Sequence, residues 1–452
     1  MRPAVIDLQE WKSVGPGDET QGGSLAGFRF EGEDQRQIAQ AFTKKRVVEF
    51  HELYDGLQIR ARSHVGRIQI GALTLTIRPK VASEQLLSLF RYAYGLDDVK
   101  RYESVDYTMG GGLFQDLVIA QLGVEAKNLI ERGVTKSYIG KAEQLSSPRG
   151  TIDFARLGAQ GGIVSATLPC RHYPRSSDNL LNQVVLAGLR LAGDLAQDRS
   201  LAASVRRLGR TFAEFATPIQ LSASVLEESE RAINRLVRPY RSVVRLIELL
   251  YQGSLVNFDG QHEARRLPGF LFDMNRFFQT LLERFLIENL RAFDVEPEHG
   301  LSEMMRFVPG HNPSKRKAPR PRPDYAVKQG RNVLALLDAK YRDLWEKPLP
   351  RDMLYQLSIY ALSQPKGSTA AILYPSDKPE ARPSLIEIRE PMSGEVSGYV
   401  AQRPVNLTRL VELVGLTGSH GEAARESYAL FLSGLASPGR PNSTSGGFAL
   451  GA

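Results

Sequence analysis

Two aspartates and a lysine in the C-terminal half of the chain have the types and spacing that phosphodiester hydrolysis uses. Asp338 and Lys340 stand two residues apart, and Asp324 precedes them. Mg²⁺ prefers oxygen ligands and often takes one or two protein carboxylates together with water and substrate oxygens. We therefore expect Asp324 and Asp338 to bind Mg²⁺, with the carbonyl of Ala339 as a further oxygen. Lys340 could orient or deprotonate the attacking water, or stabilise charge on the phosphate.

A β-hairpin would bring these three side chains together. Turn-forming residues at 328–332 separate two apolar runs, a pattern typical of a hairpin. Side chains alternate between the faces of a strand, so Asp338 and Lys340 share a face, and the hairpin folds Asp324 back beside them. An isolated Asp-x-Lys is usually a surface ion pair. Here residues 334–337 are apolar on both faces, as in a buried strand, where charges need a partner or a function.

A helix and another strand are expected after the hairpin. Residues 352–361 have helical spacing, and Gln356 and Tyr360 lie four residues apart on one face. The apolar run at 370–374 then predicts a strand, which completes a strand–helix–strand unit. We take Gln356 as a candidate catalytic residue and Tyr360 as a candidate DNA contact.

A helix upstream of the hairpin offers another acid. Residues 272–286 have amphipathic spacing, with Phe278 and Leu282 on the apolar side. Gln279 and Glu283 share a different face, one turn apart. Glu283 is therefore our candidate for an additional metal or water contact. The alternative is a solvated glutamate that pairs with a neighbouring arginine.

A basic, proline-rich loop leads into Asp324. Its prolines disfavour a helix or a central strand. Cations at this place could contact backbone phosphates, which gives salt-dependent affinity without sequence preference. The alternative is a solvated loop with no such contacts. The candidate DNA contacts are Lys315, Arg316, Lys317, Arg320 and Arg322.

Composition bounds the class of protein. Hydrophobic residues make up 42% and charged residues 24% of the 452 positions, as in ordinary globular proteins. No apolar run is long enough for a transmembrane helix, and the start lacks a signal-peptide core. We therefore expect a cytoplasmic protein that does not enter the membrane. The single cysteine, Cys170, excludes an internal disulfide and a zinc cluster. The net charge of +8 permits nucleic-acid binding without demonstrating it.

Several motifs resemble known nucleases. The order Pro323-Asp324, Asp338-Ala339-Lys340 and Gln356-x-x-x-Tyr360 resembles the PD-(D/E)xK superfamily. Further segments are similar, in order, to the McrC family, the nuclease subunits of McrBC modification-dependent restriction systems. These segments are residues 68–80, the Arg-Gly-Thr-Ile-Asp run at 149–153, and residues 177–182 and 272–275.

The resemblance implies an Mg²⁺-dependent DNA endonuclease subunit. Its partner would be a McrB-like hexameric AAA+ GTPase or ATPase, which recognises modified DNA and translocates. The family tends to carry a glutamate where this chain has Gln279. A non-catalytic DNA-binding or regulatory adaptor therefore remains an alternative, as does a repair or defence nuclease that works without a motor.

The expected fold class is α+β and multidomain. It comprises a β-rich N-terminal module, a helical middle region and an α/β restriction-endonuclease-like C-terminal domain. Gly110-Gly111-Gly112 lacks the lysine and hydroxyl residue of a P-loop, so we expect a turn or helix start there. The expected segments are a flexible N-terminus (1–22), a β-rich partner-binding module (23–105), a helical middle region (106–265), a PD-(D/E)xK nuclease domain (266–405), and a C-terminal helix with a flexible tail (406–452).

Overall fold

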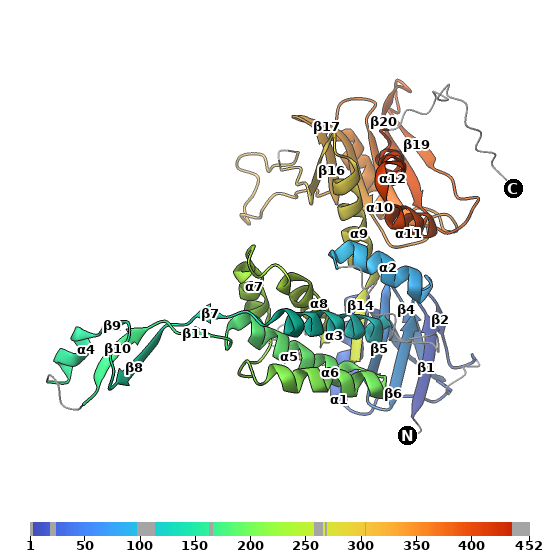
Figure 1. The fold of residues 1–452 in the computed structure, drawn as a ribbon. Helices are drawn as coiled ribbons and strands as arrows, with labels where there is room; N and C mark the ends of the chain where they lie inside the picture. Colours follow the sequence, from blue (N-terminus) through green and yellow to red (C-terminus); the bar gives the residue numbers. More distant parts are fainter. Residues whose placement is uncertain are drawn as a thin grey trace. The chain divides into compact units, whose positions relative to one another are not determined.

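The computed structural model describes residues 3–18, 24–96, 114–161, 166–256, 265–266, 269–302 and 304–435. In this part of the chain it is a mixed α/β protein with several sheets (Figure 1). The chain divides into two units, one within Met1–Lys80 and Asp97–Asp273, the other within Val81–Leu96 and Met274–Ala452. None of the described helices is both long enough and apolar enough to cross a membrane.

The first unit contains two sheets around one core. The four-stranded sheet has the order β1-β6-β5-β14, and the three-stranded sheet has the order β2-β4-β3. Their strands are β1 (Ala4–Gln9), β2 (Ser13–Val14), β3 (Val48–Leu53), β4 (Gly56–Ala61), β5 (His64–Ile70), β6 (Leu73–Arg78) and β14 (Gly269–Asp273), with helix α1 (Glu33–Lys44) beside them. β5 and β6 pair antiparallel within the four-stranded sheet, whereas β4 pairs with β2 and β3 in the other sheet.

The N-terminal segment differs from the expected flexible end at 1–22. β1 pairs in parallel with β6, and Ala4 and Ile6 are buried in the core. Alternate apolar residues are typical of a strand. The local sequence does not indicate which strand pairs with β1, because β6 lies about seventy positions away. Residues 1, 2 and 19–22 of the expected segment lie outside the described residues.

Helices form the rest of the first unit, together with a small β-rich arm. They are α3 (Phe114–Arg132), α5 (Leu180–Leu195), α6 (Arg199–Phe212), α7 (Ala223–Ala232) and α8 (Tyr240–Gly253), and the short strands β12 (Leu255–Val256) and β13 (Arg265–Arg266) follow. The segment 233–239 separates α7 from α8 and ends in Pro239, a helix breaker. The glycine run at 110–112 lies outside the described residues.

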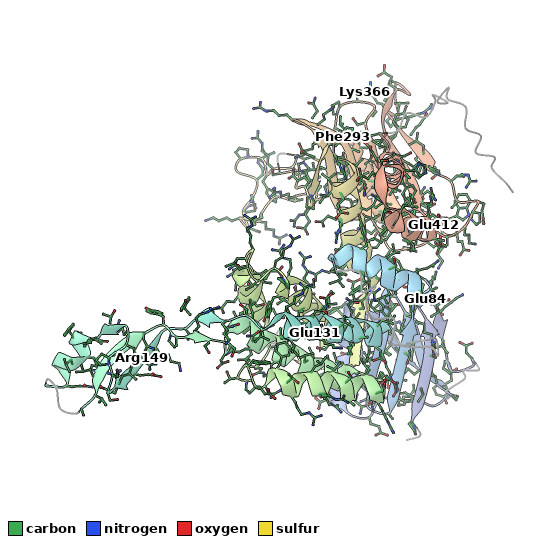
Figure 2. The ribbon with its side chains drawn as sticks, viewed as in Figure 1. Glu84, Glu131, Arg149, Phe293, Lys366 and Glu412 are labelled. Atoms are coloured by element: carbon green, nitrogen blue, oxygen red, sulfur yellow. The ribbon has the colours of Figure 1, made fainter. Side chains whose placement is uncertain are left out.

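The arm is the main departure from the expected helical middle region. A two-stranded neck, β7 (Ser137–Tyr138) with β11 (Arg175–Ser176), leads to a sheet of order β8-β10-β9, formed by β8 (Lys141–Leu145), β9 (Thr151–Ile152) and β10 (Leu168–His172), with α4 (Phe154–Ala159). Figure 1 shows the arm projecting from the end of α3, and Figure 2 labels Arg149 within it. The neck strands are two residues long, too short to leave a periodic pattern.

The second unit is built on a six-stranded sheet of order β15-β16-β17-β18-β20-β19. The strands are β15 (Asp294–Pro297), β16 (Tyr325–Gln329), β17 (Asn332–Ala339), β18 (Thr369–Pro375), β19 (Ser384–Arg389) and β20 (Val396–Val405). The helices are α2 (Ser83–Tyr94), α9 (Met274–Asn289), α10 (Arg351–Leu362), α11 (Leu407–Gly415) and α12 (Gly418–Ser433).

The predicted hairpin and the unit that follows it are confirmed. β16 and β17 pair antiparallel around the turn at Gly330, while β17, β18 and β20 run parallel. α10 connects β17 to β18 and packs on the face that carries Leu336 and Ile372. Tyr325 points to the opposite face, where its hydroxyl donates to the backbone oxygen of Gln279 in α9. The C-terminal segment holds two helices instead of the one expected, and residues 436–452 lie outside the described residues.

Candidate active site

The hairpin register brings Asp324, Asp338 and Lys340 together. Tyr325 pairs with Leu337, so Asp324, one residue before β16, stands opposite Asp338. Lys340 follows the end of β17, and its Nζ lies 2.8 Å from Asp338 Oδ2 and 3.7 Å from Asp324 Oδ2. Two carboxylates and an ammonium thus converge at one end of the sheet, as the alternation of the strand predicts.

The pKa values of Asp338 and Lys340 are both shifted in this cluster. Asp338 is 2% exposed. That burial, together with the charge of Asp324, raises the pKa of Asp338 to about 6, although Lys340 acts in the opposite direction. Burial also disfavours the Lys340 ammonium, but the attraction of Asp338 and Asp324 outweighs it, so the pKa of Lys340 is raised. At neutral pH the lysine therefore keeps its proton.

Asp324 is held by two hydrogen-bond donors on one oxygen. Its Oδ2 accepts from the backbone N–H of Ala339 at 2.7 Å and from Gln279 Nε2 at 3.1 Å. Gln279 was not among the sequence candidates, because an amide is neither an acid nor a metal ligand of choice. The available signal was its position one helical turn before Glu283.

Glu283 lies near the cluster without joining it. Burial and the charge of Glu298 raise the pKa of Glu283. The charge of Glu283 in turn helps to raise the pKa of the buried Tyr325, after burial itself and Asp324. Within the described residues the Glu283 carboxylate forms no hydrogen bond or ion pair, so it contacts neither aspartate and pairs with no arginine.

Gln356 and Tyr360 form the α10 side of the cluster. Gln356 Nε2 lies 3.5 Å from Asp338 Oδ1, at the limit of a hydrogen bond, and donates to the Tyr360 hydroxyl at 2.6 Å. Tyr360 is only 1% exposed. This corrects the expectation that Tyr360 contacts DNA. Its side chain packs in the core between α10 and the sheet, and its hydroxyl orients Gln356 by accepting a hydrogen bond from it.

The basic loop is exposed, as a DNA contact requires. All five candidate cations are on the surface. Asn312 closes part of the loop, because its side chain accepts from the N–H of Arg316 and donates to the oxygen of the same residue. Arg322 differs from the others, since its guanidinium pairs with Glu298 at 2.6 Å.

The donor set fits a divalent cation held by two carboxylates. Across the described residues, no group of three or more His, Cys, Asp or Glu side chains is arranged to hold a metal, so this structure does not group Glu283 with Asp324 and Asp338. Asp324 and Asp338 remain, both hard oxygen donors whose mutual repulsion a cation would relieve. One or two carboxylates suffice for Mg²⁺, which keeps several waters.

Comparison with known proteins identifies a family and a similar fold. The family model described as "McrBC 5-methylcytosine restriction system component" matches residues 59–375. A chain in the half-complex of Thermococcus gammatolerans McrB AAA+ hexamers with bound McrC is 21% identical, with 94% of this chain and 100% of that chain covered, at a TM-score of 0.59. This likeness supports the fold.

A chain of the cryo-EM structure of the Thermococcus gammatolerans McrBC complex is also 21% identical. There the coverage is 63% of this chain and 88% of that chain, and the TM-score is 0.43. No curated protein matches the chain.

Proposed function

Since this chain belongs to the McrBC 5-methylcytosine restriction system component family, we propose that it is the nuclease subunit of such a system. It would be an Mg²⁺-dependent DNA endonuclease of the PD-(D/E)xK type. The observation that carries the proposal is the convergence of Asp324, Asp338 and Lys340 at the end of the β16–β17 hairpin.

Each residue of the cluster has a distinct role in this proposal. Asp324 and Asp338 would hold Mg²⁺, which when bound supplies a Lewis acid for the phosphate and for water. The raised pKa of Lys340 favours a protonated ammonium. Lys340 would therefore donate to a phosphate oxygen or orient the attacking water, and it is poorly suited to act as the base. Gln356, held by Tyr360, limits the orientations of Asp338.

The substrate would be DNA bound through its backbone. The exposed cations of the basic loop shortly precede Asp324 in the sequence. In this proposal they would contact phosphates that flank the scissile bond. Such contacts position a duplex and carry no sequence information. Recognition of the modified base would then fall to a partner.

That partner is a McrB-like AAA+ GTPase or ATPase hexamer. Family membership supports this assignment, as does the fold shared with a chain from an assembly of McrB AAA+ hexamers with bound McrC. We propose that the β-rich N-terminal module, residues 23–105, contributes to partner binding.

A plasmid cleavage assay tests the proposal. Supercoiled DNA containing 5-methylcytosine is incubated with wild type or Asp338→Ala, with and without the partner and its nucleotide, in Mg²⁺ or in EDTA. Asp352→Ala, at the exposed start of α10, is the matched control. We expect cleavage only by wild type and the control, and only with partner and Mg²⁺.

Other outcomes separate the alternatives. If wild type fails to cut with the partner present, the endonuclease proposal is wrong, and a non-catalytic DNA-binding or regulatory adaptor is favoured. The observation on that side is Gln279, which stands where the family tends to have an acid. If wild type cuts equally well alone, the protein is a nuclease that needs no motor.

A further inference from the structure

One carboxylate oxygen of Asp324 receives every hydrogen bond that this side chain accepts. Gln279 Nε2 and the N–H of Ala339 both donate to Oδ2, and Lys340 Nζ lies 3.7 Å from the same atom. Oδ1 accepts no hydrogen bond from the residues that the structure describes. The carboxylate is therefore fixed in one orientation, with one oxygen engaged by the protein and the other available.

The backbone of Gln279 is held in place independently of Asp324. Its neighbours Phe277 and Phe278 are buried at 1% and 0% exposure, which anchors this turn of α9. The buried Tyr325 hydroxyl donates to the Gln279 backbone oxygen at 2.7 Å. The packing of α9 against the hairpin thus fixes the backbone from which the Gln279 amide reaches Asp324.

Charge explains why an amide is useful at this position. A glutamate of the same length would place a third negative group beside Asp324, and its ionised form could not donate a hydrogen bond. Glutamine has the same reach and donates without adding charge. Glu283, one turn later, contacts neither aspartate, so within the described chain no other α9 side chain takes over this contact.

We propose that Gln279 is a positioning residue for the cation site: its neutral amide orients Asp324 and leaves Oδ1 free for the divalent ion. Two carboxylates would then hold the cation, and the charge of Lys340 would partly neutralise them. No third acid would be needed. This inference deepens the proposed function and rests on it.

The first test removes the donor and keeps the shape. Mn²⁺ and Mg²⁺ are titrated calorimetrically into the full chain of wild type, Gln279→Met and the control Thr280→Val. Thr280 lies on the same helix and bonds only to the Arg276 oxygen. We expect cation affinity to fall about tenfold in Gln279→Met, the typical effect of losing a hydrogen bond to a charged group, and to be unchanged in the control.

The second test exchanges the amide for an acid. In Gln279→Glu the introduced carboxyl can donate to Asp324 only while it holds a proton, and two acids at this distance share one. Cation binding should then release about one more proton than in wild type. Titrations in buffers with different ionisation enthalpies measure that proton, which a purely structural role would not produce.

The outcomes distinguish this inference from the proposed function. If wild type binds the cation and cuts DNA, but Gln279→Met binds it equally well, the inference alone is overturned. The same holds if Gln279→Glu releases no additional proton, a readout that remains should Gln279→Met fold poorly. If wild type neither binds the cation nor cuts, the proposed function fails and this inference with it.

Discussion

Lys340 and Asp338 form a close ion pair in which the carboxylate is almost fully enclosed. Nζ and Oδ2 are 2.8 Å apart, and the aspartate side chain is 3% exposed while the lysine side chain is 27% exposed. The positive charge of Lys340 is thus the more accessible of the two charges, and the proposed phosphate substrate could reach it. A buried pair of this kind is weak evidence for stability and better evidence for a site.

Replacing Lys340 should abolish most of the activity. We expect Lys340→Met to lower the cleavage rate about a hundred- to thousandfold, since the transition state then lacks one charge-stabilising donor. Plasmid cleavage with partner, nucleotide and Mg²⁺ measures the effect. Lys366→Met is the control, because Lys366 pairs with Glu395 in a turn of the same unit (Figure 2). Wild-type rates in Lys340→Met would contradict the assigned role.

The pH dependence of stability should change in Asp338→Asn. The pKa of Asp338 is raised from 3.8 to about 6, so the folded state holds this proton more tightly than the unfolded state does. Stability from this group is therefore present below pH 4 and is lost as pH rises through 6. The loss amounts to about 3 kcal/mol.

Asparagine does not titrate, so that decline should disappear in Asp338→Asn. Urea unfolding at several pH values between 4 and 8 measures it. The chain has two tryptophans, Trp11 and Trp345. In a Trp11→Phe background the fluorescence of Trp345 reports on the second unit. An unchanged pH profile in the variant would show that Asp338 is not the group that titrates.

The basic loop should control affinity for DNA through salt. We expect replacement of Lys315, Arg316 and Lys317 by serine to weaken DNA binding. The slope of log K against log salt should become less steep, by up to about 0.9 for each phosphate that the variant no longer neutralises. Binding of a labelled duplex at several salt concentrations measures the slope. Replacing Lys44, Lys45 and Arg46, exposed cations at the end of α1, removes the same charge elsewhere. Equal effects of the two triple changes would argue against a specific role of the loop.

A buried polar network fixes the root of the arm. Asn182 is fully buried, accepts from the Tyr240 hydroxyl at 2.6 Å, and donates to the oxygens of Thr135 and Ser177. Asn182→Ala removes the acceptor of the buried Tyr240 hydroxyl and one of the donors to the oxygens of Thr135 and Ser177, which still accept from Asn179. The variant should therefore destabilise the first unit by about 1–3 kcal/mol. Thermal unfolding measures this, with Asn234→Ala on the exposed α7–α8 connection as the control. Equal unfolding temperatures for the two variants would show that the network contributes little.

Structural features that depend on residues close together in the chain could be predicted from the sequence. The β16–β17 hairpin, its turn and the shared face of Asp338 and Lys340 all follow from alternation over a short span. The same reasoning places Gln356 and Tyr360 on one helix face. It does not reveal that Tyr360 is buried, because which side of α10 meets the sheet depends on packing.

Contacts between distant segments were not predictable in this way. Gln279 and Asp324 are 45 positions apart, and only the packing of α9 joins them. The pairing of β1 with β6 has the same character. The arm escaped prediction for another reason: β8 is exposed along most of its length and carries no apolar alternation, so its residues resemble a polar loop.

The neck of the arm also has an evolutionary consequence. Ser137 and Ser176 are paired across β7 and β11, so the chain leaves α3 and returns to α5 at neighbouring points. Substitutions, insertions or exchanges between these two residues would leave the register of the helices unchanged. The segment beyond the neck can therefore diversify under its own selection, while the helices that carry it remain constrained by their packing.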